Sequence, residues 1–143
     1  MRLVVDASVV VPCFIPERFS DVAPFWLEAA ELVIAPDFLA LGCANVLWKK
    51  PRLREISEIQ AGKTLADIVS GVIELRPSLP LTPAALKLGG EMDQPGYDCL
   101  YLALAETEGA EIVTADRTLW RRMVARRPGL QAHWIADRLP KVH

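Results

Sequence analysis

The stretch Leu3-Val4-Val5-Asp6 decides the fold, because it is a short apolar run of strand-forming residues that ends on a carboxylate. A continuously apolar run of this length is typical of a strand buried on both faces. Residues 32–35 and 111–114 repeat the pattern, and residues 71–75 and 131–135 are weaker candidates. Strands of this kind that alternate with helices predict an α/β fold, in which helices cover both faces of a central parallel sheet of four or five strands.

Helices are expected between the strands, and several have a recognisable start or end. The expected segments are residues 8–14, 20–30, 37–50, 57–69, 82–92, 97–108 and 116–127. Four of them are predicted to begin at a capping side chain, namely Ser20, Asp37, Ser57 and Thr82. Pro51 is expected to end the helix before it, and Gly109 to close the apolar helix at 97–108.

The composition limits the class of protein. With 143 residues, 52% of them hydrophobic, residues 1–143 are expected to form a single domain, not a disordered chain. The net charge of -2 excludes a polycation, so contact with a nucleic acid would need a local basic patch or a metal ion. No apolar run is long enough for a membrane span, and the start of the chain does not resemble a signal peptide.

The sulfur and imidazole side chains argue against two further classes of site. Cys13, Cys43 and Cys99 are an odd number without paired spacing, so we expect reduced core thiols and a cytoplasmic protein. His133 and His143 are the two histidines, and without clustered thiols they do not predict a zinc site.

Three aspartates are the candidate functional residues. Asp6 ends the first strand and Asp116 follows the strand at 111–114, so both should lie at the carboxyl edge of the sheet, where α/β folds place ligands. Asp98 lies in the first turn of the apolar helix, on the same stripe as Tyr101. Carboxylates gathered at one edge repel each other, and a divalent cation such as Mg²⁺ or Mn²⁺ would relieve that repulsion.

A simpler interpretation exists for each aspartate taken alone. Asp6 and Asp116 can each cap the helix that follows, and Asp98 can favour the dipole of its own helix. The functional hypothesis therefore depends on whether the three side chains meet.

Four stretches resemble a known family: Val4-Val5-Asp6-Ala7-Ser8; Ala35-Pro36-Asp37 followed by Ala44-Asn45-Val46-Leu47-Trp48-Lys49; Tyr97-Asp98-Cys99-Leu100-Tyr101-Leu102-Ala103-Leu104-Ala105-Glu106; and Val113-Thr114-Ala115-Asp116. Together they resemble the PIN domain, and more narrowly the VapC-type toxins of toxin–antitoxin pairs. The resemblance implies a three-layer PIN fold, Mg²⁺- or Mn²⁺-dependent endoribonuclease activity on RNA, a homodimer, and a cognate antitoxin.

The resemblance also assigns roles to individual residues. Asp6, Asp98 and Asp116 match three of the four metal-site carboxylates that are usual in the family, and are the expected catalytic and metal-binding residues. Ser8 and Thr114 match supporting hydroxyls. The fourth position, normally a glutamate, is Gly42 here. Asn45 lies three residues further along the same helix face, where it could supply a neutral oxygen to the metal site or could be a structural amide. Asp37, five residues before Gly42, is less well directed at that site.

Two hypotheses of different classes follow. The first is a metal-dependent endoribonuclease that an antitoxin neutralises. The second is a catalytically degenerate PIN domain that acts as a protein-interaction module because Gly42 lacks a ligand. Phosphatase or receiver chemistry fits less well, since Asp6-Ala7-Ser8 lacks the second aspartate of an Asp-x-Asp motif.

Two basic clusters could form a track for the phosphate backbone or a solvated surface. They comprise Arg117, Arg121, Arg122, Arg126 and Arg127 in one helix, and Lys49, Lys50, Arg52 and Arg54 at the end of another. The aromatic residues at helical spacing, Trp26 and Trp48 among them, are expected in the core or under a protein partner, not as base-stacking platforms.

Overall fold

The computed structural model describes residues 1–139; residues 140–143, which include His143, lie outside the described part. The strands are β1 (Arg2–Val5), β2 (Leu32–Pro36), β3 (Glu74–Arg76), β4 (Glu111–Thr114) and β5 (Ala132–Trp134). The helices are α1 (Ala7–Val10), α2 (Ala23–Ala29), α3 (Leu39–Arg52), α4 (Glu58–Val69), α5 (Thr82–Met92), α6 (Gly96–Glu108) and α7 (Arg117–Arg126). Short 3-10 turns follow α1 (Val11–Cys13) and precede α5 (Leu79–Leu81).

The five strands form one parallel sheet in the order β3-β2-β1-β4-β5. β1 is the central strand, and Leu3, Val4 and Val5 are completely buried, as a strand covered on both faces requires. Val5 is in register with Val113, which places the ends of β1 and β4 side by side. The predicted parallel sheet is confirmed, and its register brings Asp6 next to Thr114.

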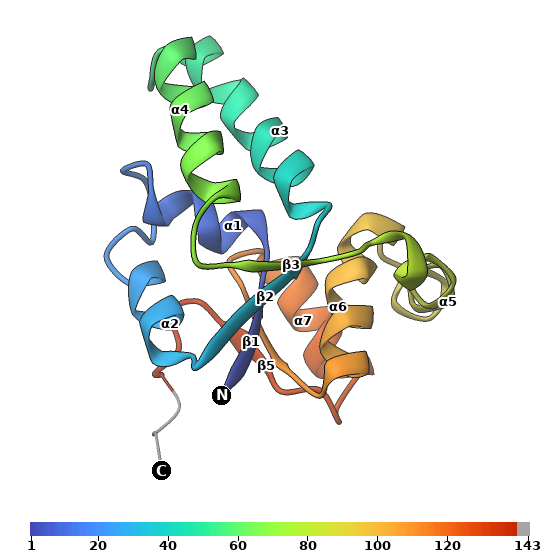
Figure 1. Cartoon of the computed structure of the whole chain (residues 1–143). Coiled ribbons are helices and arrows are strands. Elements are labelled where there is room, and N and C mark those ends of the chain that lie inside the picture. Colours follow the sequence, from blue (N-terminus) through green and yellow to red (C-terminus); the bar gives the residue numbers. More distant parts are fainter. Residues whose placement is uncertain (140–143) are drawn as a thin grey trace.

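Helices cover both faces of the sheet, which gives the expected three layers (Figure 1). α6 contacts β1, β2 and β4, and α5 and α7 lie beside it. α1 and α2 are on the other side, where the Trp26 indole donates a hydrogen bond to the carbonyl of Ile135.

The prediction of a central apolar helix is confirmed by α6, in which every residue from Cys99 to Ala105 is buried. Gly109 closes α6 with a φ of 62°, the left-handed conformation that a residue without a Cβ adopts most easily. Ser57 caps α4 as predicted, accepting a hydrogen bond from the backbone N–H of Gln60 at 3.1 Å.

Three predicted caps are wrong. α2 begins at Ala23, and the Ser20 hydroxyl instead accepts from Glu17 and donates to the carbonyl of Ile15. The Asp37 carboxylate accepts from the backbone N–H of Ser78, so it is engaged by the β3–α5 connection and does not cap α3. The Thr82 side chain makes no cap, because Thr82 is the first residue of α5.

Pro51 does not end the third helix. It lies inside the last turn of α3, which continues to Arg52, with Leu53 donating to the carbonyl of Lys49. A proline this close to the end removes one donor but leaves that closing bond intact, so it costs less than in a helix interior.

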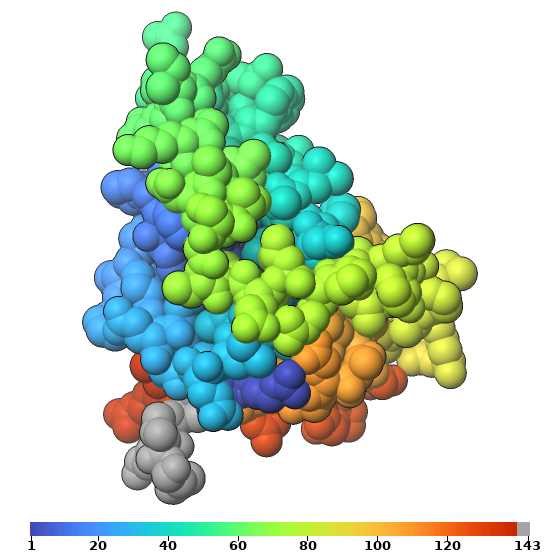
Figure 2. All heavy atoms as spheres, viewed as in Figure 1, coloured from blue at the N-terminus to red at the C-terminus, as the bar shows by residue number. Residues whose placement is uncertain are grey.

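α3 and α4 run side by side and project beyond the carboxyl edge of the sheet as a narrow arm, which Figures 1 and 2 show from the same side. Among residues 1–139 there is no helix with the length and apolar character that crossing a bilayer would take.

Candidate active site

Asp6 is the innermost of the three aspartates, at the end of central strand β1. One carboxylate oxygen accepts from the backbone N–H of Ser8 at 3.1 Å and from the Ser8 hydroxyl, with which it is in close contact. The other accepts from the hydroxyl of Thr114 at 2.6 Å. Thr114 is completely buried, so this bond ties the ends of two neighbouring strands together.

The surroundings of Asp6 oppose its ionisation. Burial raises its pKa from 3.8 to about 6, and the negative charges of Asp98 and Asp116 raise it as well, whereas the hydrogen bonds from Ser8 and Thr114 lower it. The negative charges of Asp98 and Asp116 thus add to the effect of burial in this acidic neighbourhood.

Asp116 lies at the N-terminus of α7, where its carboxylate accepts from the backbone N–H of Leu119 at 3.1 Å. Its own N–H donates to the Thr114 hydroxyl oxygen at 3.0 Å. Thr114 therefore joins the two strand-end aspartates, donating to Asp6 and accepting from Asp116. The Ser8 hydroxyl makes a parallel link, since it accepts from the N–H of Ala115 at 2.9 Å. Ser8 and Thr114 thus lie beside Asp6, as the family resemblance implied.

Asp98 reaches the same neighbourhood from the first turn of α6. Burial raises its pKa, a hydrogen bond from Gln94 lowers it, and the charge of Asp116 raises it. The Gln94 side-chain amide donates to its carboxylate at 3.0 Å.

The capping interpretation is confirmed for Asp6 and Asp116, and the shared-site interpretation stays a prediction. Asp6 caps α1 and Asp116 caps α7, yet each cap occupies one carboxylate oxygen and leaves lone pairs unused. Within residues 1–139, no three His, Cys, Asp or Glu side chains converge into a ready-made ligand set. The carboxylates therefore share an electrostatic field without being in contact.

Gly42 lies beside this neighbourhood on α3. A Cβ at this position would be 3.6 Å from the Tyr101 hydroxyl and 3.7 Å from the Cβ of Ala7, which are ordinary contacts. Burial raises the pKa of Tyr101, as do the charges of Asp6, Cys43 and Asp98. Asn45 is exposed one turn further along α3.

The donor set suits a hard divalent cation. Its side chains offer carboxylate and hydroxyl oxygens, the ligands that Mg²⁺ and Mn²⁺ prefer. The raised pKa of Asp6 is consistent with such a cation, because a positive charge would offset both the burial of Asp6 and its like-charged neighbours.

Several basic side chains already have partners within the protein. Lys50 is buried between Glu17 and Glu55, at 2.5 and 2.9 Å, so the phosphate-track interpretation is wrong for it. In α7, Arg117 lies over the ring of Trp134, Arg122 contacts Asp93 and Gln94, Arg126 donates to the carbonyl of Glu91, and Arg127 pairs with Glu91 and Glu106.

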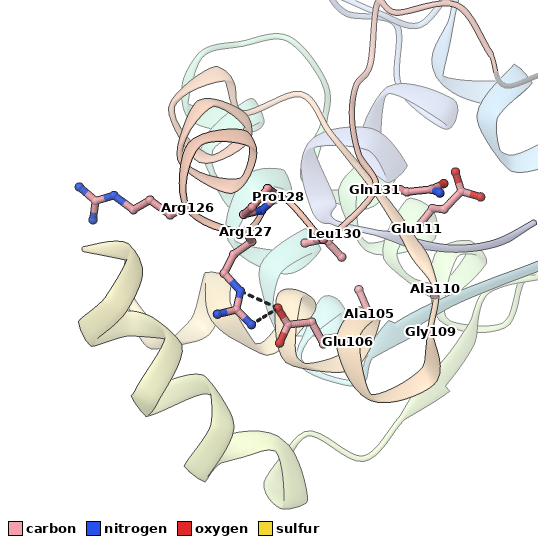
Figure 3. Close-up of a pocket in the computed structure, with 11 residues that line it drawn as sticks. Ala105, Glu106, Gly109, Ala110, Glu111, Arg126, Arg127, Pro128, Leu130 and Gln131 are labelled. Atoms are coloured by element: carbon pink, nitrogen blue, oxygen red, sulfur yellow. Dashed lines mark hydrogen bonds and ion pairs between the residues drawn. The ribbon is translucent and has the colours of Figure 1, made fainter.

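A hollow of about 580 Å³ lies at the opposite, amino end of β4 and β5. Figure 3 shows Arg127 directed at Glu106 on its wall, while Arg126 points away. None of the three aspartates lines it, and the length of the strands separates it from the candidate site.

The chain matches the PIN domain family over residues 3–124. It is a PIN-domain protein. It is 30% identical over 127 residues to ribonuclease VapC3 of Pyrobaculum aerophilum, which covers 87% of this chain and 97% of that protein. This likeness places the chain in the VapC-type group.

Solved structures share the fold. VapBC2 from Rickettsia felis, bound to a DNA fragment from its promoter, matches with a TM-score of 0.66 and 16% identity over 94% of this chain and 98% of that chain. A toxin–antitoxin complex from Klebsiella pneumoniae matches with a TM-score of 0.52 and 15% identity over 80% of this chain and 86% of that chain.

Sequence reasoning missed Gln94 and Arg122, the residues that hold Asp98. Gln94 stands four residues before Asp98, but Pro95 separates it from the helix, so helical spacing gave no signal. Arg122 lies 24 residues after Asp98 and is linked to it only by way of Gln94, which contacts both.

Proposed function

We propose that this PIN-domain protein is a toxin-type endoribonuclease that hydrolyses RNA phosphodiester bonds with Mg²⁺ or Mn²⁺ at Asp6, Asp98 and Asp116. The observation that supports this most is the link through Thr114, which joins Asp6 to Asp116 while Asp98 lies in the same field. The name of the relative, ribonuclease VapC3, supports the reaction class.

The residues have distinct roles in this proposal. Asp6, Asp98 and Asp116 hold the cation, which when bound would polarise a phosphoryl oxygen and favour ionisation of an attacking water. Ser8 and Thr114 orient Asp6. His133 pairs with Glu111 at 2.8 Å and Lys50 with two glutamates, so neither is available as a general base.

A cognate antitoxin is the proposed partner, as in the complex from Klebsiella pneumoniae. Large apolar side chains are exposed on α3, α4 and the turn after α1: Phe14, Leu41, Trp48 and Ile59. A protein partner would cover such a surface. We further propose a single domain that forms a homodimer, and a cytoplasmic location, since Cys13, Cys43 and Cys99 are free thiols.

The alternative is a degenerate PIN domain that binds partners without cleaving RNA. The observation that favours it is Gly42, because α3 places no carboxylate where the resemblance expects a glutamate. The two proposals differ in one measurable property, which is metal-dependent cleavage.

The test compares wild type, Asp98→Asn and Gly42→Glu on a circular RNA, which has no ends and reports internal cleavage only. We expect cleavage with Mn²⁺ by wild type, a loss of at least about 100-fold in Asp98→Asn, and a gain in Gly42→Glu. A Cβ at Gly42 would make only ordinary contacts, and Gly42→Gln is the matched uncharged control.

Equal rates in all three proteins would contradict the site assignment. If wild type is inactive but Gly42→Glu cleaves, the degenerate interpretation is correct. Mn²⁺ calorimetry on the same proteins separates a lost ion from a misaligned substrate, because a missing ligand lowers affinity whether or not RNA is present.

A further inference from the structure

Asp98 has one side-chain partner in the described part of the chain, and that partner is an amide. Gln94 Nε2 donates to Asp98 Oδ2 at 3.0 Å, from the connection between α5 and α6. Asp98 is half-buried, so water reaches its carboxylate only in part and the carboxylate depends strongly on such a donor.

Arg122 fixes which way this amide faces. Its guanidinium donates to Gln94 Oε1 from α7. Arginine has donors only, and an ionised carboxylate has acceptors only. The oxygen of Gln94 must therefore face Arg122 and its nitrogen must face Asp98, so the amide has one orientation that satisfies both neighbours.

The backbone around Gln94 is held as well. Asp93 ends α5 in a left-handed conformation with a φ of 53°, and its carbonyl also accepts from Arg122. The Gln94 carbonyl lies 3.0 Å from where a Cβ at Gly89 would be, so the connection packs directly onto α5 because Gly89 has no side chain.

The helix that carries Arg122 is capped by Asp116. One proposed ligand therefore lies at the N-terminus of α7, and six residues later the same helix carries the arginine that contacts Gln94, the partner of Asp98. A shift of α7 would disturb both carboxylates together.

We infer that Gln94 and Arg122 are positioning residues of the proposed metal site: Arg122 holds the Gln94 amide, and the amide holds the Asp98 carboxylate. This inference rests on the proposed function for its role in metal binding. The hydrogen-bonded relay itself can be tested without metal.

The first experiment follows the side-chain amide of Gln94 by NMR in the metal-free protein. We expect a resonance pair that is shifted and exchanges slowly, unlike the exposed Gln60, and that moves to the position of Gln60 in Arg122→Met. Arg126→Met is the matched control, because it removes a charge and a backbone contact to α5 without touching Gln94. A Gln94 signal like that of Gln60 in wild type would overturn the relay.

The second experiment measures Mn²⁺ affinity in a double-mutant cycle of Gln94→Ala and Arg122→Met. Each single change should weaken binding about 10-fold, a size typical of residues that orient a ligand. The double variant should bind as weakly as Gln94→Ala alone, because Arg122 acts through Gln94. Additive losses would contradict that order, and an equal loss in Arg126→Met would indicate a general effect of charge.

The two failures are distinguishable. If wild type binds no Mn²⁺, the proposed metal chemistry fails, and the NMR result alone decides whether the relay exists. If wild type binds Mn²⁺ but both variants bind equally well with unchanged unfolding temperatures, the positioning role is refuted while the proposed function stands.

Discussion

At the scale of single residues, Asp6 is held where its charge is unfavourable. The end of β1 is buried, and Asp98 and Asp116 add negative charge, so hydrogen bonds from Ser8 and Thr114 only partly compensate. Proteins usually neutralise or pair such a group. An unfavourable carboxylate at a sheet edge is what the proposed cation site requires, because a bound cation would offset its charge.

Stability should therefore depend on pH through Asp6. Its pKa is about 6 in the folded protein against 3.8 for an unperturbed aspartate, so the folded state binds the proton more tightly and stability from this group is lost as pH rises through 6. We therefore compare the unfolding free energy of metal-free Asp6→Asn with that of wild type. The variant minus wild-type difference should increase by about 2 kcal/mol between pH 4 and pH 7.5, because only wild type loses stability over this range. Denaturant unfolding at several pH values measures this.

Asp137→Asn serves as a control for removing a carboxylate elsewhere. A constant difference between Asp6→Asn and wild type over pH 4 to 7.5 would show that Asp6 is not buried among like charges, and would weaken the proposed site as well.

At the scale of elements, the far end of the α3–α4 arm, where α3 turns into α4, is fixed by a buried charge (Figure 1). Lys50 is 7% exposed and sits between Glu17, before α2, and Glu55, between α3 and α4. These ion pairs anchor the end of α3, which Pro51 weakens by removing a backbone donor.

Lys50→Ala should lower the unfolding free energy by about 2 kcal/mol, because it leaves two carboxylates unpaired. This loss is smaller than the loss expected for a fully buried ion pair, since Glu55 is half exposed. The neighbouring Lys49→Ala should change it by less than about 0.5 kcal/mol, as Lys49 is exposed. Chemical denaturation of both variants gives the comparison. Similar losses in the two would show that Lys50 is solvated.

At the scale of the whole molecule, Glu108 joins distant parts of the chain. At the end of α6, its carboxylate pairs with Arg2 of β1 at 2.7 Å and with Arg76 of β3 at 2.9 Å. The side chain of Glu108 is 20% exposed, so these pairs are partly shielded from solvent. The edge strand β3 is thereby tied to the central strand through a helix.

Glu108→Gln should cost about 1 kcal/mol of unfolding free energy, and the difference from wild type should shrink in 1 M salt. β3 should lose the most protection from hydrogen exchange, because its three residues have few other contacts outside β2. Exchange measured by mass spectrometry checks this, and unchanged protection of residues 74–76 would contradict it.

Many of the strands and helices that build the whole molecule could be predicted from the sequence. Leu3-Val4-Val5, Glu111–Thr114 and the apolar helix at Gly96–Glu108 were readable because burial on all sides leaves an uninterrupted apolar pattern. Caps were less readable. Ser20 and Asp37 have side chains that can cap, but the loops at Ile15 and Ser78 engage them first.

The residues of the candidate site also fall into those that the sequence indicates and those that only the fold reveals. Residue types and their places in the chain were enough to propose all three aspartates. Asp6 and Asp116 follow parallel strands, whose ends meet at one edge, and Asp98 lies in the first turn of an apolar helix. Only the tertiary structure decided that Thr114 links two of them, and that Gln94 and Arg122 hold the third. Those contacts join residues from 4 to 108 positions apart, whose partners depend on how helices pack and not on any local pattern.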